Sequence, residues 1–460
     1  MVFERVKTGS DELDKVLHGG FPINTMNVIM GAPGTGKTIL AEQLVFANAG
    51  SKSPALYLTT LSEPLDKFIT HGQTYRFFDS SRIGETVHYE DLGIMVRERG
   101  IAALADIVAE LLAQIRPRLI VIDSFKALNE LIDNQHDRRT ILFDLASVLG
   151  SYSCTVFLVG EYSGEMMTEL PEFAIADSIL LLIKQASGVR EQRFLKVEKL
   201  RGSGSIPGMH AFNISETGID VYPRLLTPRI APSYKPNVER VNTGIPGLDD
   251  MIERGFWRGS TTLVAGPTGS GKTIIGLQFI REGVLNGEPG LYAGFQENPV
   301  QLARIMQHFD WDPASLLEGG LFELLYRSPV EMQLDSVATD LFRHVRDGRI
   351  KRIVIDALGD LKKSSSDAQR FSDFMYALTQ WFAAQNVTCM LMYELHHLFE
   401  SAAISDEEIS NMADNIVLLR YTSDVEMARK IRIIKTRGSS HDHWEHSYEI
   451  SNRGVVIKSE

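Results

Sequence analysis

The feature that most constrains this chain is an internal repeat with a spacing of 235 residues. The segment GAPGTGKT at residues 31–38 returns as GPTGSGKT at residues 266–273, and 266 − 31 = 235. RVKTGSDELD at residues 5–14 returns as RVNTGIPGLD at residues 240–249, and 240 − 5 is again 235. Similarity at one fixed spacing is typical of a tandem duplication. We therefore expect two similar domains, although the length alone allows two or three.

Other segments recur at nearly the same spacing. LIVIDS at residues 119–124 matches RIVIDA at 352–357, and EKLRGS at 198–203 matches IKTRGS at 434–439. Between the halves, the sequence PRLLTPRIAPSYKPNV at residues 223–238 contains four prolines and no periodicity. Proline fixes φ and lacks a backbone donor, so this segment is predicted to be an extended linker. We place the first domain at residues 1–228 and the second at residues 229–460.

The order of apolar runs predicts the fold class. In the first half, short apolar runs alternate with segments of helical periodicity, as expected for a parallel sheet with crossover helices. The predicted strands are 26–30, 55–59, 119–123 and 156–159, and the predicted helices are 38–47 and 102–115. Later runs with glycine-rich turns predict an antiparallel extension at the sheet edge, at 179–183, 194–199 and 211–214. The class is α/β, with two tandem domains of mostly parallel sheet flanked by helices.

Composition excludes several classes of function. Of 460 residues, 44% are hydrophobic and 23% charged, which is ordinary for a folded globular chain. Acidic residues outnumber basic ones by 59 to 47, a balance that argues against nucleic acid as the main partner. Two cysteines form neither a disulfide framework nor a four-thiolate metal site. With no apolar run long enough for a membrane span and no signal peptide pattern, we expect a cytoplasmic location and no membrane attachment.

Both halves contain the pattern G-x-x-x-x-G-K-T between an apolar run and a helical segment, which is the context that a phosphate-binding loop requires. Its glycines let backbone N–H groups face a phosphate, and the following helix adds the positive end of its dipole. A fortuitous glycine turn is disfavoured because two copies occur in register. The predicted nucleotide-binding residues are Gly31, Pro33, Gly34, Thr35, Gly36, Lys37, Thr38 and Ile39, and then Gly266, Thr268, Gly269, Ser270, Gly271, Lys272, Thr273 and Ile274.

Four residues are predicted to hold Mg²⁺ together with ATP. The hydroxyls of Thr38 and Thr273 follow the loop lysines, and Asp123 and Asp356 each end an apolar strand. An aspartate at the carboxyl end of a parallel strand lies at the ligand edge of the sheet. Such an aspartate binds Mg²⁺ directly or through water. On its own it would more often be a helix cap.

Catalytic candidates are the loop lysines and two glutamates. Lys37 and Lys272 would neutralise the transferred phosphate. Glu63 and Glu297 follow the second strand of each half, 26 and 25 residues after the loop lysine, because 63 − 37 = 26 and 297 − 272 = 25. A carboxylate there can activate a water molecule for attack on the terminal phosphate. The alternative is a solvated loop acid.

Taken together, the paired loops, the T-G-x-x-x-L-D motifs at Thr8–Asp14 and Thr243–Asp249, and the closing K-L-R-G and K-T-R-G segments resemble the KaiC family of RecA-like ATPases. The resemblance covers nearly the whole chain. It implies a homohexameric double ring with ATP and Mg²⁺ between neighbouring subunits, a role in timing or signalling, and a KaiB-like protein partner. It also implies trans-acting residues at Lys199, Leu200, Arg201, Lys435 and Arg437. Without the resemblance, these basic residues could simply be solvated on a hairpin.

This chain departs from the family pattern at three places. The family has two successive glutamates after the second strand, whereas this chain has Ser62 before Glu63 and Gln296 before Glu297. Of the adjacent serine and threonine that the clock protein phosphorylates in its second half, only Ser410 is kept. Ser410 is therefore the phosphorylation candidate of a serine autokinase and autophosphatase. A long tail that contacts a KaiA activator is also absent from the sequence, so activation by KaiA is not expected.

The function predicted from the sequence is a KaiC-like ATPase that hydrolyses ATP at intersubunit sites. A first alternative is a nucleotide-gated interaction scaffold with little hydrolysis, which the missing first glutamates favour. A second alternative is a DNA-acting RecA-like ATPase, which the net charge of −12 disfavours.

Overall fold

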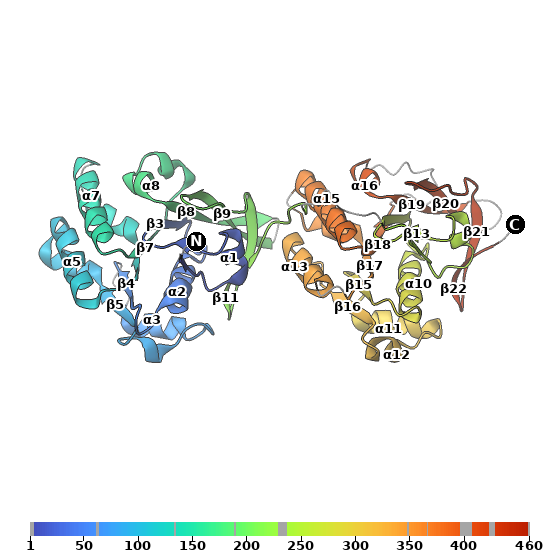
Figure 1. The fold of residues 1–460 in the computed structure, drawn as a ribbon, viewed down its shortest axis with the longest axis horizontal. Helices are drawn as coiled ribbons and strands as arrows, with labels where there is room; N and C mark the ends of the chain where they lie inside the picture. The colour runs from blue at the N-terminus through green and yellow to red at the C-terminus, as the bar shows by residue number, and fades with distance from the viewer. Residues whose placement is uncertain are drawn as a thin grey trace. The chain divides into compact units, whose positions relative to one another are not determined.

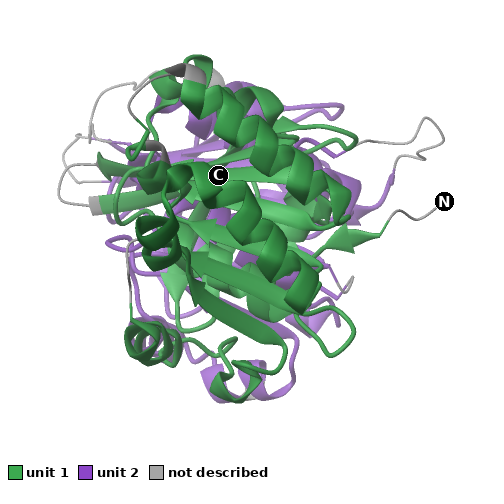
Figure 2. Cartoon of the chain, turned by 90° about the vertical axis from the view of Figure 1, so that its left-hand side faces the viewer, with its two compact units in different colours: residues 1–224 green, residues 225–460 purple. Residues whose placement is uncertain are grey.

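The computed structural model describes residues 4–60, 64–132, 135–187, 190–228, 237–346, 349–365, 367–395, 407–422 and 428–458. Glu63 and residues 229–236 of the proline-rich segment lie outside this part. Contacts divide the chain into two compact units, residues 1–224 and 225–460, which Figure 2 colours separately. Each unit contains one phosphate loop and one large sheet.

The first unit is built on a sheet with the strand order β11-β10-β9-β8-β3-β7-β6-β4-β5 (Figure 1). The strands from β8 to β5 in this order are parallel, and the remaining pairs are antiparallel. The parallel strands are β3 (Met26–Gly31), β4 (Ala55–Thr59), β5 (Val87–Asp91), β6 (Leu119–Asp123), β7 (Thr155–Gly160) and β8 (Ser178–Ser187). The antiparallel extension is β9 (Arg190–Leu200), β10 (Met209–Ser215) and β11 (Gly218–Tyr222), with β1 (Arg5–Val6) and β2 (Phe21–Pro22) forming a separate ribbon.

Helices cover both faces of this sheet. Side chains alternate along each strand, so one set packs under α4, α5, α7 and α8 and the other under α1, α2 and α3 (Figure 1). The helices are α1 (Asp11–Val16), α2 (Lys37–Asn48), α3 (Leu65–Gly72), α4 (Leu92–Arg99), α5 (Leu104–Ile115), α6 (Phe125–Asn129), α7 (Gln135–Ser151) and α8 (Pro171–Ile175).

The second unit repeats this architecture with the strand order β16-β15-β17-β18-β14-β19-β20-β21-β22. Its strands are β12 (Arg240–Val241), β13 (Phe256–Trp257), β14 (Thr261–Gly266), β15 (Gly290–Gly294), β16 (Phe322–Tyr326), β17 (Arg352–Asp356), β18 (Thr388–Glu394), β19 (Asn415–Thr422), β20 (Ala428–Thr436), β21 (His446–Ser451) and β22 (Gly454–Ile457). Its helices are α9 (Leu248–Met251), α10 (Lys272–Leu285), α11 (Pro299–His308), α12 (Pro313–Glu318), α13 (Leu334–Val345), α14 (Leu358–Lys363), α15 (Ala368–Ala384) and α16 (Glu407–Met412).

The predicted fold class is confirmed, including the antiparallel edge. All the predicted strands and helices of the first half are present, with ends that move by a few residues at most apart from the longer β8 and β9. Strand β5 was not predicted, because its sequence VHYED places charged residues on an edge strand with a weak apolar pattern. Within the described residues, no helix is both long and apolar enough to cross a membrane.

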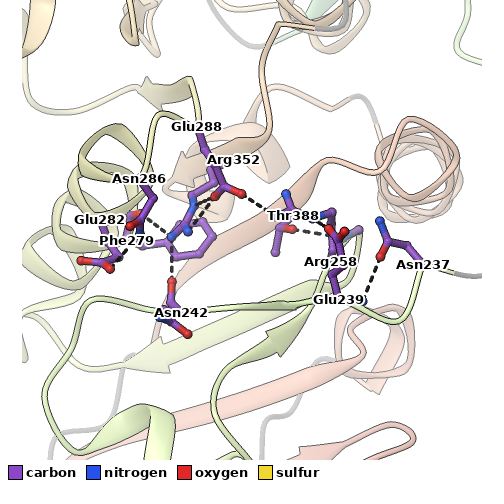
Figure 3. A network of polar contacts seen from close by, with 11 residues as sticks. Asn237, Glu239, Asn242, Arg258, Phe279, Glu282, Asn286, Glu288, Arg352 and Thr388 are labelled. Atoms are coloured by element: carbon purple, nitrogen blue, oxygen red, sulfur yellow. Dashed lines mark hydrogen bonds and ion pairs between the residues drawn. The ribbon is translucent and has the colours of Figure 1, made fainter.

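The second unit contains a buried ionic network that the first unit lacks at the matching position. Arg352 begins β17 and is 2% exposed, whereas Leu119 begins the equivalent strand β6. The Arg352 guanidinium contacts the Glu288 carboxylate at 2.8 Å and donates to the carbonyl of Asn242 at 2.7 Å (Figure 3). Glu288 also accepts from Arg258. The network links β17 to Asn242, the residue that follows β12.

Candidate functional site

The first phosphate loop joins β3 to the amino terminus of α2. Gly36 is the residue before the helix and has φ of 100°, in the left-handed region that glycine favours. A Cβ on Gly36 would lie 2.9 Å from Ile214 Cδ1, so a side chain there would also meet the antiparallel extension. No side-chain hydrogen bond caps α2 in the described structure. The first N–H groups of the helix therefore stay available for an anion.

Lys37 is a nearly buried cation in this loop, with 8% of its surface exposed. Its Nζ donates to the carbonyl of Ala32 at 2.8 Å. Burial lowers the pKa of Lys37, while the charges of Glu161 and Asp123 oppose that shift. A desolvated cation of this kind is suited to an anionic ligand.

Thr38 and Asp123 meet beside the lysine. The Thr38 hydroxyl donates to Asp123 Oδ2 at 2.7 Å. The peptide bond that follows Asp123 is cis. The two residues lie 85 positions apart in the chain and are joined only because β6 and α2 reach the same end of the sheet.

These residues line a cavity of about 420 Å³. The predicted residues in its wall are Gly34, Gly36, Lys37, Thr38, Ile39 and Asp123. The wall also contains Ser124, Lys126, Ala127, Glu130, Glu161 and Ile214, which the sequence analysis did not single out. The volume is in the range of ligand pockets.

The second unit repeats the arrangement. Gly271 precedes α10 with φ of 91°, and the Thr273 hydroxyl donates to Asp356 Oδ2 at 2.7 Å. Lys272 is 9% exposed, and its Nζ donates to the carbonyls of Gly266 and Pro267, each at 2.8 Å. Burial lowers the pKa of Lys272 and raises that of Asp356. Both loops therefore hold a buried lysine next to a threonine–aspartate pair.

The cavity of the second unit is larger, about 570 Å³, and has a different wall. Its predicted residues are Thr268, Gly269, Gly271, Lys272, Thr273, Ile274, Glu297 and Asp356. The other lining residues are Gln296, Arg304, Ile305, His308, Phe309, Ala357, Glu394 and Ile450. Helix α11 thus supplies Arg304, Ile305 and His308 to this cavity, whereas α3 supplies none of the described residues in the wall of the first.

Glu297 faces the second cavity, whereas Glu63 lies outside the described residues. Burial raises the pKa of Glu297 above its ordinary value, and the nearby charge of Asp356 adds to the shift. The side-chain amide of Gln296 donates to Asp360 Oδ2 at 2.8 Å. The side chain of Gln296, the residue before Glu297, is therefore held by a hydrogen bond to α14.

Two further pairs of residues, which the sequence did not predict, lie at the candidate sites. The phenol of Tyr57 donates to Asp123 Oδ2 at 2.9 Å, and that of Tyr292 donates to Asp356 Oδ2 at 2.6 Å. Burial raises the pKa of both phenols well above the ordinary value. The spacing 292 − 57 = 235 could have drawn attention to them, since it equals that of the loops.

The second pair is Glu161 and Glu394, which stand at the ends of β7 and β18. Each lines its cavity, and the Glu394 carboxylate accepts a hydrogen bond from the Thr268 hydroxyl. Their spacing, 394 − 161 = 233, matches that of Asp123 and Asp356. Each unit therefore places a second acid near its phosphate loop.

Comparison with known proteins assigns the chain to a family. The family model described as "ATPase: KaiC" matches residues 6–225 and again residues 241–460. The chain belongs to the KaiC ATPase family. The circadian clock oscillator protein KaiC of Acaryochloris marina (strain MBIC 11017) is 26% identical over 99% of this chain and 88% of the relative. The KaiC proteins of Synechococcus elongatus (strain ATCC 33912 / PCC 7942 / FACHB-805) and Parathermosynechococcus lividus are 26% and 27% identical, over 99% and 98% of this chain and 89% and 85% of theirs.

Each KaiC-like unit ends with a basic segment, K-L-R-G at residues 199–202 or K-T-R-G at residues 435–438. Neither segment lines the cavity of its own unit. Lys199 donates to the carbonyl of Phe173 at 3.2 Å, and Arg201 lies 3.8 Å from Asp177. Leu200 is the last residue of β9 and packs against the core. The side chains of Lys199 and Arg201 thus lie at the end of α8 rather than in the cavity.

The KaiC-like motif of the second unit makes matching contacts. Lys435 donates to the carbonyls of Ala413 and Ser410, at 2.8 and 3.1 Å. Arg437 donates to the carbonyl of Asn411 at 2.7 Å and lies 3.6 Å from Asp414. The phosphorylation candidate Ser410 is therefore one hydrogen bond from a predicted trans-acting lysine.

The donor set fits Mg²⁺ in both units of this KaiC-like chain. A threonine hydroxyl and an aspartate carboxylate are oxygen ligands, and Mg²⁺ in nucleotide sites uses one or two carboxylates and keeps several waters. In each unit the two groups are already in contact beside the nearly buried lysine. The residues that would hold the ion are Thr38 with Asp123 and Thr273 with Asp356.

Proposed function

We propose that each unit binds ATP with Mg²⁺ and hydrolyses it to ADP and phosphate. The observation that carries this proposal is the repeated contact of a threonine hydroxyl with an aspartate carboxylate at 2.7 Å, next to a nearly buried lysine in a cavity. Membership of the KaiC ATPase family supports nucleotide binding as the common activity.

Catalysis of phosphoryl transfer consists mainly of positioning the reacting groups and neutralising their charge. Residues of this chain would supply most of both. Backbone N–H groups at the start of α2 and α10 would hold the phosphates, and Lys37 and Lys272 would neutralise the terminal one. Mg²⁺ held by Thr38 with Asp123 and by Thr273 with Asp356 would supply neutralisation of phosphate charge. Burial of each lysine makes this interaction stronger than it would be in water, because competing solvent is removed.

Glu297 is our proposed general base in the second unit. It lines the cavity with Lys272 and Thr273, and its raised pKa makes it a better proton acceptor than an ordinary glutamate. Gln296 cannot take this role, because an amide does not accept a proton at neutral pH. By the repeat, we propose that Glu63 acts in the first unit.

The proposed assembly is a homohexamer in which each nucleotide lies between neighbouring subunits. Lys199, Leu200, Arg201, Lys435 and Arg437 would act on the nucleotide of the next subunit, in the manner of an arginine finger. Their positions outside the cavities of their own units are consistent with action in trans. Contacts of one head-to-tail type form a closed ring when their rotation closes.

Three finer proposals rest on the family. Ser410 is proposed as a site of serine autophosphorylation and dephosphorylation, since its helix lies against Lys435. A KaiB-like partner and a timing or signalling role are expected of a KaiC relative. The cytoplasm, which supplies ATP and Mg²⁺, is the expected location.

Phosphate release by the full chain tests the activity. We expect ATP-dependent release that requires Mg²⁺ and is lost in a Lys37→Ala/Lys272→Ala double variant. Turnover no higher than that of the double variant would contradict the proposal.

Native mass spectrometry with and without Mg²⁺ and ATP tests the assembly, and a monomer under both conditions would contradict the intersubunit sites.

A nucleotide-gated interaction scaffold is a second candidate function. The hydrogen bond from Gln296 to Asp360 favours it, because a glutamine occupies the family's usual base position and is held there. A scaffold of this kind would bind ATP tightly and turn over less than about once per hour, compared with about 10 s⁻¹ for a median enzyme. Turnover measured together with nucleotide affinity separates the two functions.

A further inference from the structure

The aspartate proposed to hold Mg²⁺ accepts two hydroxyl hydrogen bonds on one oxygen in each unit. Asp123 Oδ2 accepts from Thr38 at 2.7 Å and from Tyr57 at 2.9 Å. Asp356 Oδ2 accepts from Thr273 at 2.7 Å and from Tyr292 at 2.6 Å. The threonine belongs to the phosphate loop, whereas the tyrosine comes from a neighbouring strand.

Strand register explains how the phenol reaches the carboxylate. Thr59 of β4 pairs with Asp123 of β6, so Tyr57 stands two residues before the partner of Asp123. Residues two apart share a face of the sheet, and diagonal neighbours lie within reach of an aromatic side chain. In the second unit Gly294 pairs with Asp356, and Tyr292 again stands two residues earlier.

Packing alone does not require a hydroxyl at these positions. Tyr57 is 3% exposed and lies in the core with Phe68 and Phe157, and Tyr292 is 1% exposed. The ring of Tyr292 lies beside α10, where a Cβ on Gly276 would be 3.4 Å from Tyr292 Cε2. A phenylalanine would fill either position equally well and would avoid burying a polar group.

The two halves have changed around these tyrosines. The equivalent strands read ALYLT in β4 and GLYAG in β15, so three of five residues differ while the tyrosine is kept. Both tyrosines donate to the aspartate that ends the neighbouring strand, Asp123 of β6 or Asp356 of β17. The same contact of phenol and carboxylate therefore occurs in both units, although most residues of the strand that carries the tyrosine differ.

We propose that Tyr57 and Tyr292 are positioning residues that orient the carboxylates of Asp123 and Asp356 for Mg²⁺. This inference rests on the proposed binding of Mg²⁺ with ATP. Outer groups that donate to a ligating carboxylate fix its orientation, and removing such a group typically costs 10- to 100-fold in metal affinity. Neither phenol is expected to touch the nucleotide, so binding of ATP without metal should not depend on it.

The test is equilibrium binding of a fluorescent ATP analogue to the full chain, first in EDTA and then against increasing free Mg²⁺. Tyr57→Phe is made in a Lys272→Ala background, so that the signal reports the first site, and Tyr292→Phe is made in a Lys37→Ala background. Tyr89→Phe is the matched control, because the Tyr89 ring stacks on Tyr57 with centroids 5.7 Å apart. Far-UV circular dichroism measures whether each variant is folded.

We expect the half-saturating Mg²⁺ concentration to rise about tenfold or more in both Phe variants, with unchanged binding in EDTA and no change in the control. Unchanged Mg²⁺ dependence in folded Phe variants would overturn the inference. Loss of the fold in both variants would also overturn it, since the hydroxyls would then support the core. If the parent proteins gain nothing from Mg²⁺, the proposed function fails instead.

Discussion

The hydroxyl of Thr38 lies 2.7 Å from Asp123 Oδ2, although 85 residues separate them in the chain. Thr273 and Asp356 repeat this contact at 2.7 Å across 83 residues. A bond between a loop hydroxyl and a strand-end carboxylate places two oxygen ligands of the kind that Mg²⁺ prefers beside a nearly buried lysine.

Asp123→Asn should reduce ATP turnover at the first site by about 100-fold or more. A neutral amide no longer supplies the charge that holds the metal. A bound metal ion lowers the free energy of the transition state by several kcal/mol. The measurement is phosphate release in a Lys272→Ala background, which silences the second site. Asp144→Asn, on the exposed surface of α7, is the control and should leave turnover unchanged. Equal turnover in the two variants would contradict the role of Asp123.

Nucleotide affinity at the second site should fall as the pH rises, and the fall should begin below pH 10.5, the ordinary pKa of lysine. Burial lowers the pKa of Lys272, so the free site loses its positive charge at a lower pH than a solvated lysine would. Below that pKa the ammonium is present and attracts phosphate, and above it the attraction is lost. Fluorescent ATP binding to a Lys37→Ala variant, measured from neutral pH upward, checks this. Constant affinity up to pH 10.5 would refute it.

Glu394→Gln should tighten ATP binding at the second site by roughly fivefold. The Glu394 carboxylate lines the cavity, and its negative charge attracts the Lys272 ammonium more strongly than that of Asp356 does. The same negative charge repels an incoming phosphate. Glutamine keeps an acceptor for the Thr268 hydroxyl while removing the charge. Isothermal titration with ATP and Mg²⁺ measures the change, and Glu449→Gln on the β21 hairpin serves as a control for net charge. Weaker binding would show that Glu394 supports the nucleotide.

Arg352→Met should destabilise the second unit by about 3 kcal/mol. It removes one partner of a buried ion pair and leaves the Glu288 carboxylate with less compensation, a change that typically costs 3–5 kcal/mol. Because Glu288 keeps its contact with Arg258, we expect a loss of unfolding free energy near the lower end of this range. Urea unfolding followed by circular dichroism is the measurement. The matched control, Arg99→Met, breaks an exposed pair with Glu110 and should change stability little. Equal midpoints for the two variants would be inconsistent with a stabilising network.

Mixing two inactive variants should restore activity if Arg437 acts in trans. One variant lacks the second loop lysine (Lys272→Ala), the other lacks the arginine (Arg437→Ala), and both carry Lys37→Ala. In an equal mixture, about a quarter of the interfaces would pair an intact loop with an intact arginine in a ring of identical contacts. Phosphate release by the mixture, with mixed oligomers verified by native mass spectrometry, is the measurement. No recovery in verified mixed oligomers would argue for action within one chain.

Much of the site was predictable because its chemistry is local. Lys37 and Thr38 follow a glycine pattern whose physical requirements can be read along the chain. Asp123 was predicted because it ends an apolar strand, and the carboxyl ends of parallel strands meet at one edge of the sheet. The assignments of the nucleotide-binding, metal-binding and trans-acting residues remain predictions to be tested by the experiments above.

Tyr57 was not predictable, because its role depends on which strands become neighbours. β4 pairs with β6, and only this order and register bring the phenol to Asp123. The same holds for Arg352, since its charge at the start of a strand gives no sign that it is buried against Glu288. Neither contact leaves a trace in local periodicity.

The sequence by itself determined the duplication, the α/β class and the two phosphate loops, and it predicted the lysine, threonine and aspartate of each site. These follow from spacing and periodicity, which act over a few residues or repeat at a constant distance. Only the tertiary structure decided that Tyr57 and Tyr292 donate to those aspartates, that Glu161 and Glu394 line the cavities, and that Glu297 faces the second cavity. The physical reason is that hydrogen bonds and desolvation depend on contacts across strands and loops far apart in the chain, which only the complete strand order creates.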